Sequence, residues 1–233
     1  MKREIVVLKY GESVFNESYI FRGGCHEKML PISFTIYLIR DGERNILVDA
    51  GCNDGAGFVM SVFDKPVNIL KDYGVMPEDI TDVIITHHHH DHIEAIRDYP
   101  NAVIHMQKAE YEKGKTYISQ TQKVELFDEE KVIADGLVVK KIGGHSVGSS
   151  VVLCTCNDKA YLLCGDECYV KDCFLHHVPT GSSYDVSLSE QFINDYCDEA
   201  YEFLLFHDPH IMQGEIGYKL IENRSKVNLN IAN

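Results

Sequence analysis

Five histidines and an aspartate lie within one short segment near the middle of the chain. Residues 86–92 read THHHHDH and follow a run of valine and isoleucine that predicts a short buried strand. The histidines therefore lie on the loop at the end of that strand. Because side chains alternate in an extended loop, His87 and His89 face one side, and Asp91 and His92 follow where the chain begins to turn. This arrangement predicts ligands for two adjacent metal ions.

The same segment could be a run of surface histidines or a purification tag. A tag would lie at a terminus and would lack the carboxylate that follows here. Imidazole and carboxylate suit borderline metals, zinc first, although the same ligands accept iron, manganese or cobalt. By the alternation of side chains, His88 and His90 are expected to face the protein wall or solvent.

The composition limits the classes of partner. The chain has 233 residues, 45% of them hydrophobic, which is ordinary for a globular protein. The partner that we expect is a small-molecule substrate. A formal charge of −14 argues against nucleic acid as a partner, because nucleic-acid binding needs clustered lysine and arginine. No apolar run is long enough to span a membrane, and the first residues lack the features of a signal peptide. We expect a cytoplasmic protein without a membrane partner, and a homodimer is left open.

The eight cysteines include no Cys-x-x-Cys pair, so structural disulfides are not expected. Cys154 and Cys164 lie in apolar runs that indicate core positions. Cys52 and Cys168 lie beside candidate site residues. Each is either a core residue or a soft additional metal ligand.

Alternating strand and helix patterns predict one α/β domain over residues 1–233. Strands are expected at 5–8, 33–39, 45–49 and 82–86 in the first half, and the strand rhythm repeats in the second half. Helices are expected over 57–73, ended by Gly74, and over about 187–200. Residues 11–31 are expected to form a long irregular connection.

Three further candidate metal ligands occur in the same sequence pattern, in which a metal-binding side chain comes shortly after the end of an apolar strand. They are His145, Asp166 and His207. Strand ends on one edge of a sheet face the same crevice, so the three can converge on the histidine loop. A single histidine or aspartate at a strand end is weak evidence, but together with the loop these residues suffice for two metal ions.

These motifs resemble the metallo-β-lactamase superfamily. The matching residues, in the order that the family has them, are His87-x-His89-x-Asp91-His92, Gly144-His145-Ser146, Gly165-Asp166 and His207. Within the superfamily the chain is most similar to the N-acyl-homoserine lactonases. The motifs shared with them are Leu30-Pro31, the strand end Ile46-Leu47-Val48-Asp49, the helix–strand connection Pro77-Glu78-Asp79, Glu110-Tyr111, and a tyrosine three residues after Asp166, which is Tyr169 here. The resemblance implies an αβ/βα four-layer sandwich.

The resemblance also implies a division of the ligands and a reaction. One metal would be held by His87, His89 and His145, the other by Asp91, His92 and His207, with Asp166 as the bridge. A hydroxide shared by the two metals would attack a lactone or related ester. Asp91, Asp166 and Tyr169 would be the catalytic residues, with the Tyr169 hydroxyl stabilising the leaving oxygen. Asp49-Ala50-Gly51 resembles the turn that supports the histidine loop in this family.

Two other activities of the superfamily stay open. A thioester hydrolase of the glyoxalase II type uses the same ligand set, although the chain shows no basic cluster suited to a glutathione carboxylate. An iron-dependent redox member is the other alternative. The chain also departs from the lactonases after His92, where Ile93-Glu94-Ala95 stands in place of small residues, so pocket access and acyl preference are not fixed by the resemblance.

Overall fold

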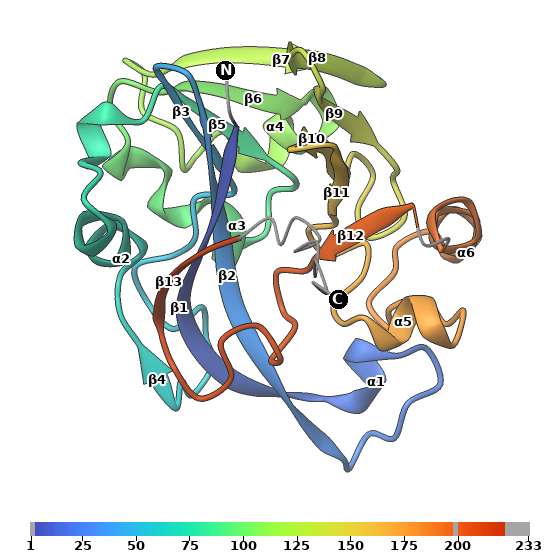
Figure 1. Ribbon diagram of the computed structural model, residues 1–233. Helices are drawn as coiled ribbons and strands as arrows, with labels where there is room; N and C mark the ends of the chain where they lie inside the picture. Colours follow the sequence, from blue (N-terminus) through green and yellow to red (C-terminus); the bar gives the residue numbers. More distant parts are fainter. Residues whose placement is uncertain (1–2, 198–199, 222–233) are drawn as a thin grey trace, which may run out of the picture.

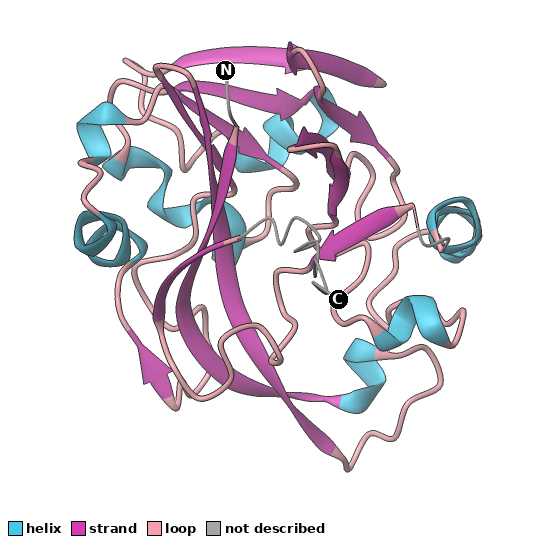
Figure 2. Ribbon diagram, in the orientation of Figure 1, coloured by secondary structure: helices cyan, strands magenta, loops and turns pink. Residues whose placement is uncertain are grey.

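Two β-sheets pack face to face, and helices cover their outer sides (Figure 1). This computed structural model describes residues 3–197 and 200–221. In the view of Figure 2, α2 lies to the left of the strands and α5 and α6 lie to their right. The layers form the αβ/βα sandwich of the metallo-β-lactamase fold, as the sequence predicted.

The larger sheet contains eight strands. Its order is β13-β1-β2-β3-β5-β6-β7, and β4 pairs with β1. β1, β2 and β3 are antiparallel, whereas β3, β5, β6 and β7 are parallel. The bounds are β1 Glu4–Asn16, β2 Met29–Asp41, β3 Arg44–Val48, β4 Val62–Phe63, β5 Asp82–Ile85, β6 Val103–Gln107, β7 Lys123–Phe127 and β13 Gly217–Leu220.

The smaller sheet contains five strands in the order β12-β11-β10-β9-β8. β11 and β12 are parallel, and the other neighbours are antiparallel. The bounds are β8 Glu130–Ala134, β9 Leu137–Lys141, β10 Ser150–Cys156, β11 Lys159–Leu163 and β12 Tyr201–Leu204. Side chains from both sheets, among them Val7, Ile39, Val152 and Leu163, form the core between them.

Short helices connect and cover the strands. α2 lies at the outer side of the larger sheet, and α5 and α6 lie at the outer side of the smaller one (Figure 1). None of the helices in the described residues is long and apolar enough to cross a membrane. The bounds are α1 Glu17–Ile20, α2 Pro66–Tyr73, α3 His90–Ile93, α4 Lys108–Gly114, α5 Asp172–Leu175 and α6 Val186–Tyr196, with the 3-10 helices η1 Pro77–Asp79 and η2 Glu94–Asp98.

Two expectations about local structure were wrong. Most of residues 11–31 are not irregular, because β1 continues to Asn16 and pairs with β2 past a register shift between Lys9 and Gly11. The helix expected over 57–73 begins only at Pro66, whose missing N–H suits the first turn of a helix. Gly74 ends that helix with φ 94°, as expected.

The helix expected over about 187–200 is α6, which begins one residue earlier and ends at Tyr196. The side chain of Asp185 caps it by accepting hydrogen bonds from the backbone N–H groups of Ser187 and Leu188. Residues 198–199 lie outside the described part of the chain. The single domain over residues 1–233 stays a prediction, because residues 222–233 also lie outside it.

Candidate metal centre

Loops at the ends of strands in both sheets meet at one edge of the sandwich. The histidine loop follows β5, Asp166 follows β11, His207 follows β12, and His145 lies between β9 and β10. The structure brings all seven predicted ligand residues together in two adjacent groups. The first group is His87, His89, His145 and Asp166, and the second is Asp91, His92 and His207.

In the first group, each residue offers a nitrogen or oxygen atom to a common point. These atoms all lie within 4.8 Å of one another. Nε2 of His145 lies 3.0 Å from Nδ1 of His89 and 3.4 Å from Oδ2 of Asp166. Nε2 of His87 lies 3.6 Å from the same Asp166 oxygen. Two nitrogens held about 2.0–2.1 Å from one tetrahedral zinc ion lie about 3.3 Å apart, so these spacings fit a shared ion.

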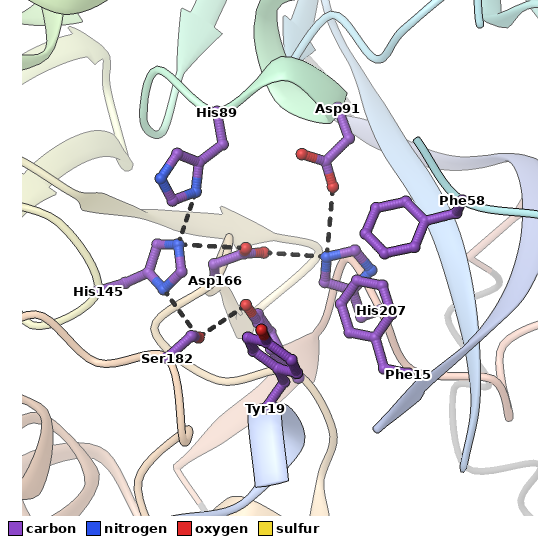
Figure 3. Close-up of a pocket in the computed structure, with 10 residues that line it drawn as sticks. Phe15, Tyr19, Phe58, His89, Asp91, His145, Asp166, Ser182 and His207 are labelled. Atoms are coloured by element: carbon purple, nitrogen blue, oxygen red, sulfur yellow. Dashed lines mark hydrogen bonds and ion pairs between the residues drawn. The ribbon is translucent and has the colours of Figure 1, made fainter. Parts of the chain in front are cut away.

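In the second group, the atoms converge on the other oxygen of Asp166. Oδ1 lies 3.0 Å from Nε2 of His92 and 3.3 Å from Nε2 of His207. Oδ2 of Asp91 lies 3.6 Å from Nε2 of His207. Figure 3 shows Asp166 between His145 on one side and His207 on the other. The Asp166 carboxylate therefore presents one oxygen to each group.

The outer ring nitrogens of His87, His92 and His207 have oxygen partners, which set the direction of each ring. Nδ1 of His92 donates to Oδ2 of Asp49 at 2.8 Å, and Nδ1 of His207 donates to the backbone carbonyl of Ser33 at 2.9 Å. A hydrogen on Nδ1 leaves the lone pair on Nε2, the nitrogen that faces Asp166. Such partners orient metal-binding histidines and increase their basicity.

Thr86 gives His87 the same kind of partner. The Thr86 hydroxyl donates to the carboxylate of Asp49 at 2.9 to 3.0 Å. Its oxygen is then free to accept from Nδ1 of His87, 3.2 Å away. The turn at Asp49, which has φ 63°, thus supports two histidines of the loop, His87 through Thr86 and His92 directly.

Four buried atoms that face the centre have no hydrogen-bond partner among the described residues. They are Nε2 of His87, Nε2 of His92, Nε2 of His207 and Oδ1 of Asp166. Buried polar atoms are nearly always paired, because an unpaired one loses its hydration without compensation. Bound cations would satisfy all four. The donor set and its inward-facing lone pairs therefore fit two metal ions.

Burial and charge prepare the groups for metal binding. Burial lowers the pKa of His145 to about 4 and the pKa of His87 well below its ordinary value. Both rings are therefore neutral at pH 7, with a lone pair to donate. Burial raises the pKa of Asp166, but the surrounding histidines outweigh it and hold that pKa well below its usual range. Asp166 is therefore an ionised carboxylate.

Tyr169 lies beside both groups. It is buried, and its hydroxyl is 2.8 Å from the hydroxyl of Ser182. Its ring contacts the ring of His207 with 4.9 Å between centroids. Burial raises the pKa of Tyr169 well above its ordinary value, so the phenol keeps its proton at neutral pH.

A cavity of about 400 Å³ opens onto the two groups. His89, Asp91 and Asp166 form part of its floor, and Phe15, Phe58 and Tyr19 form apolar walls (Figure 3). A small molecule with a polar head and an apolar tail matches this division of the surface.

The remaining histidines of the loop lie outside both groups. Nδ1 of His88 donates to the carboxylate of Glu110, and Nε2 of His90 donates to Asp54 at 2.8 Å. Cys52 and Cys168 also lie outside both groups and are buried in the core. Their positions therefore favour core residues over additional metal ligands.

Sequence reasoning missed three residues that shape the site. Glu110, which appeared only within a shared motif, accepts hydrogen bonds from His88 and from the loop after His145. Glu167 accepts from the backbone N–H groups of Gly144 and His145 at 3.1 and 3.2 Å. Ser182 lies in a polar loop that carries no distinguishing pattern.

Comparison with known proteins agrees with this geometry. An N-acyl homoserine lactonase of a Bacillus species is 28% identical over 187 residues, which cover 70% of this chain and 75% of the relative. N-acyl homoserine lactonase AiiA of Bacillus thuringiensis subsp. kurstaki is 26% identical over 212 residues, covering 80% and 85%. The fold matches an N-acyl homoserine lactone hydrolase structure with N-hexanoyl-L-homoserine bound at its catalytic metal centre (TM-score 0.79, 23% identity, 91% and 96% coverage). The profile of the metallo-beta-lactamase superfamily matches residues 34–191, and the chain therefore belongs to that superfamily.

Proposed function

We propose that the protein is a di-metal hydrolase that opens the ring of an N-acyl-homoserine lactone or a related ester. One observation carries the proposal: the Asp166 carboxylate lies between two groups of metal-binding side chains at the floor of a partly apolar cavity. The relatives described above, which are named as lactonases, support this reaction over others in the superfamily.

The seven residues would hold two divalent ions. Zinc suits imidazole and carboxylate ligands, and iron, manganese and cobalt are accepted by the same donors. The ions supply Lewis acidity and lower the pKa of water from 15.7 towards about 7, which provides a nucleophile at neutral pH. The proposed ligands are His87, His89 and His145 for one ion, Asp91, His92 and His207 for the other, and Asp166 for both.

Side chains around the ions would bind and orient the lactone. Asp91 and Asp166 face the cavity and position the reacting centre through the ions that they hold. The protonated Tyr169 hydroxyl would donate a hydrogen bond to the ring oxygen as the ring opens and negative charge develops on that oxygen. Removal of one such donor typically lowers the rate by about 10²–10³.

The cavity walls favour an uncharged acyl group. Phe15 and Phe58 lie 4.5 Å apart between ring centroids and form one wall. No lysine or arginine is among the described residues that line the cavity. A glutathione thioester carries carboxylates that would have no cationic partner there, so this alternative receives no support from the cavity.

Metal analysis followed by a pH-stat assay tests the proposal. The substrates are N-acyl-homoserine lactones, simple γ-lactones and a glutathione thioester. We expect two equivalents of metal and hydrolysis of the lactones. Asp166→Asn and His89→Ala should each lower metal content and abolish activity, whereas His90→Ala, in the same loop but outside both groups, should retain its metal. Two equivalents of iron with no turnover of any substrate would contradict the proposal.

Further features follow from this function as proposals. Hydrolysis of acyl-homoserine lactones would make the protein a quorum-quenching enzyme. Zinc as the native metal, a cytoplasmic location, the exclusion of nucleic acid as a partner and a homodimer stay predictions. Size-exclusion chromatography with light scattering would test the homodimer, and metal analysis of the protein from its native source would test zinc.

A further inference from the structure

Ser182 lies between a residue of the first metal group and Tyr169. Its hydroxyl oxygen is 3.4 Å from Nδ1 of His145 (Figure 3). The same oxygen is 2.8 Å from the hydroxyl of Tyr169. It also lines the cavity. The three side chains therefore form a continuous line from the proposed metal centre to the hydroxyl that would face the substrate.

The backbone fixes the position of Ser182. The N–H of Gly181 donates to the carbonyl of Tyr19 at 2.9 Å, and a Cβ at Gly181 would lie 1.7 Å from the carbonyl of Ser18, so the close approach requires glycine. On the other side, the N–H of Asp185 donates to the carbonyl of Gly144, next to His145. The loop of Ser182 is thus attached both to α1 and to the loop of His145.

The chemistry of the three groups sets the order of donors. Nε2 of His145 faces His89 and Asp166, so its lone pair belongs to the centre and the hydrogen of the neutral ring is on Nδ1. That hydrogen points at the oxygen of Ser182. A hydroxyl that accepts in this way still has its own hydrogen to donate, and Tyr169 is the neighbour that can accept it.

The consequence falls on the proton of Tyr169. If Ser182 donates to Tyr169, the phenol hydrogen is directed towards Asp166 and the cavity that Asp166 lines. If Tyr169 instead donates to Ser182, that hydrogen is directed away from the substrate. A hydrogen on Nδ1 of His145 favours the first arrangement. In the second arrangement two donors would share the Ser182 oxygen, and neither His145 nor Tyr169 would accept the Ser182 hydrogen.

We infer that Ser182 is a positioning residue that accepts from Nδ1 of His145 and donates to Tyr169, so that the Tyr169 hydroxyl points at the leaving oxygen of the substrate. This inference rests on the proposed function and deepens it. Ser182 links metal binding to stabilisation of the leaving oxygen by a hydrogen bond, and no proton is transferred along the line. It acts through its two neighbours.

Removal of the Ser182 hydroxyl should therefore have two separable effects. Nδ1 of His145 loses its acceptor, and loss of such a partner typically lowers metal affinity by about 10–100-fold. Tyr169 keeps its hydroxyl but loses its orientation, so kcat should fall roughly tenfold, less than the 10²–10³ for complete loss of a donor. KM should stay unchanged, because the lost interaction forms only in the transition state.

A double-mutant cycle tests both effects. The variants are Ser182→Ala, Tyr169→Phe and their combination, with Ser182→Thr as a rescue that restores the hydroxyl. Ser183→Ala is the matched control. The Ser183 hydroxyl donates to the carbonyl of Thr180 and accepts from the hydroxyl of Ser189, and among the described residues no hydrogen bond joins it to His145 or Tyr169. Zinc affinity is measured by competition with a chromogenic chelator, and kcat and KM are measured with N-hexanoyl-homoserine lactone.

Ser182→Ala should lower zinc affinity both in the parent protein and in the Tyr169→Phe variant. It should lower kcat in the parent protein but not in the Tyr169→Phe variant. Unchanged zinc affinity, additive losses of kcat, or equal losses in Ser183→Ala would each overturn the inference. If Ser182→Ala does not fold, Ser182→Cys replaces it, since a thiol is a weak acceptor, and the same outcomes apply.

Failure of the proposed function would be distinguishable. If the parent protein hydrolyses no lactone, the proposed function is lost and the role of Tyr169 with it. The zinc competition still decides the contact between Ser182 and His145, because it needs no substrate. Lower affinity in Ser182→Ala but not in Ser183→Ala would support that contact, and equal affinities would overturn it.

Discussion

Asp49 holds the ring of His92 through a hydrogen bond of 2.8 Å from Nδ1, although the two residues are separated by 43 positions in the chain. The same ring is stacked on Phe206, with 3.8 Å between centroids. These two contacts fix the orientation of the His92 ring. Asp49 has no place in either metal group, yet it decides which nitrogen of His92 faces Asp166.

Asp49→Asn should disturb that tautomer while keeping the size of the side chain. Thr86 also donates hydrogen bonds to the Asp49 carboxylate. In the variant, the amide oxygen of asparagine would accept these hydrogen bonds, and the NH₂ group would then face His92. An NH₂ group cannot accept from Nδ1, so the ring would carry its hydrogen on Nε2. We expect zinc affinity to fall by about 10–100-fold in a chelator competition. Asp72→Asn, at an exposed position, should bind zinc like the parent, and parent-like affinity in Asp49→Asn would contradict the role of Asp49.

Glu110 joins the two loops that carry the first metal group. Its carboxylate accepts from the backbone N–H of His88 at 3.0 Å and from the backbone N–H of Gly148 at 2.7 Å. The hydroxyl of Ser146 donates to it at 2.8 Å. Burial raises the pKa of Glu110, but these hydrogen bonds and His88 outweigh it and hold the pKa at about 2, so the group is an ionised, fully paired carboxylate.

Glu110→Gln should loosen both loops at once. The amide replaces one acceptor oxygen with an NH₂ group that faces other donors, so at least one buried group loses its hydrogen-bond partner. Such a loss typically lowers the free energy of unfolding by about 1–3 kcal/mol. We expect lower unfolding free energy in urea and a lower zinc content. Glu112→Gln is the control on the same helix, because the side chain of Glu112 is 67% exposed and pairs only with Lys115 there. Equal stability of the two variants would show that Glu110 does not join the loops.

The strand ends and the ligands could be predicted because each depends on a local pattern. The apolar run before His87 indicated β5, and a strand end followed by a metal-binding side chain indicated Asp166 and His207. The parallel strands then bring these ends to one edge. Alternation of side chains likewise separated His87 and His89 from His88 in an extended loop.

The supporting contacts could not be predicted because they join distant parts of the chain. Ser182 meets Tyr169 at a separation of 13 residues and His145 at 37, and Glu110 meets Ser146 at 36. No periodic pattern relates such positions. The expected irregular segment at 11–31 failed for a related reason, since Gly11 interrupts the strand pattern locally while pairing with β2 continues across it.

A buried cluster around Asp82 lies at the end of β5 opposite to the histidine loop. It predicts that the stability of the fold depends on pH. Asp82 accepts from Nε2 of His105 at 2.8 Å and from Nε of Arg44 at 3.0 Å. Burial raises the pKa of Asp82, but these hydrogen bonds outweigh it and hold the pKa well below its usual range. The ordinary value in the unfolded chain is about 3.9.

A pKa that is lower in the folded than in the unfolded state stabilises the fold above the unfolded pKa. The contribution of Asp82 should therefore be full from pH 7 to about 5 and should decline as the pH falls below about 4. Asp82→Asn should unfold at lower urea concentration at pH 7, and its difference from the parent should shrink in acid. Asp128→Asn, whose side chain is 67% exposed, should show no such pattern. A difference that stays constant from pH 7 to pH 3 would contradict the ionic role of Asp82.

The cysteines beside the site should behave as core residues. Burial raises the pKa of Cys52 to about 12, and its thiol donates to the carbonyl of Asp54, so it stays protonated at pH 8. Because the thiolate is the reactive form, iodoacetamide should modify the exposed Cys25 in the folded protein and reach Cys52 only after unfolding, as read by peptide mass spectrometry. Cys52→Ala and Cys168→Ala should retain the zinc content of the parent. Loss of zinc from either variant would restore that cysteine as a metal ligand, and rapid modification of Cys52 in the folded protein would show that its thiol is not enclosed in the core.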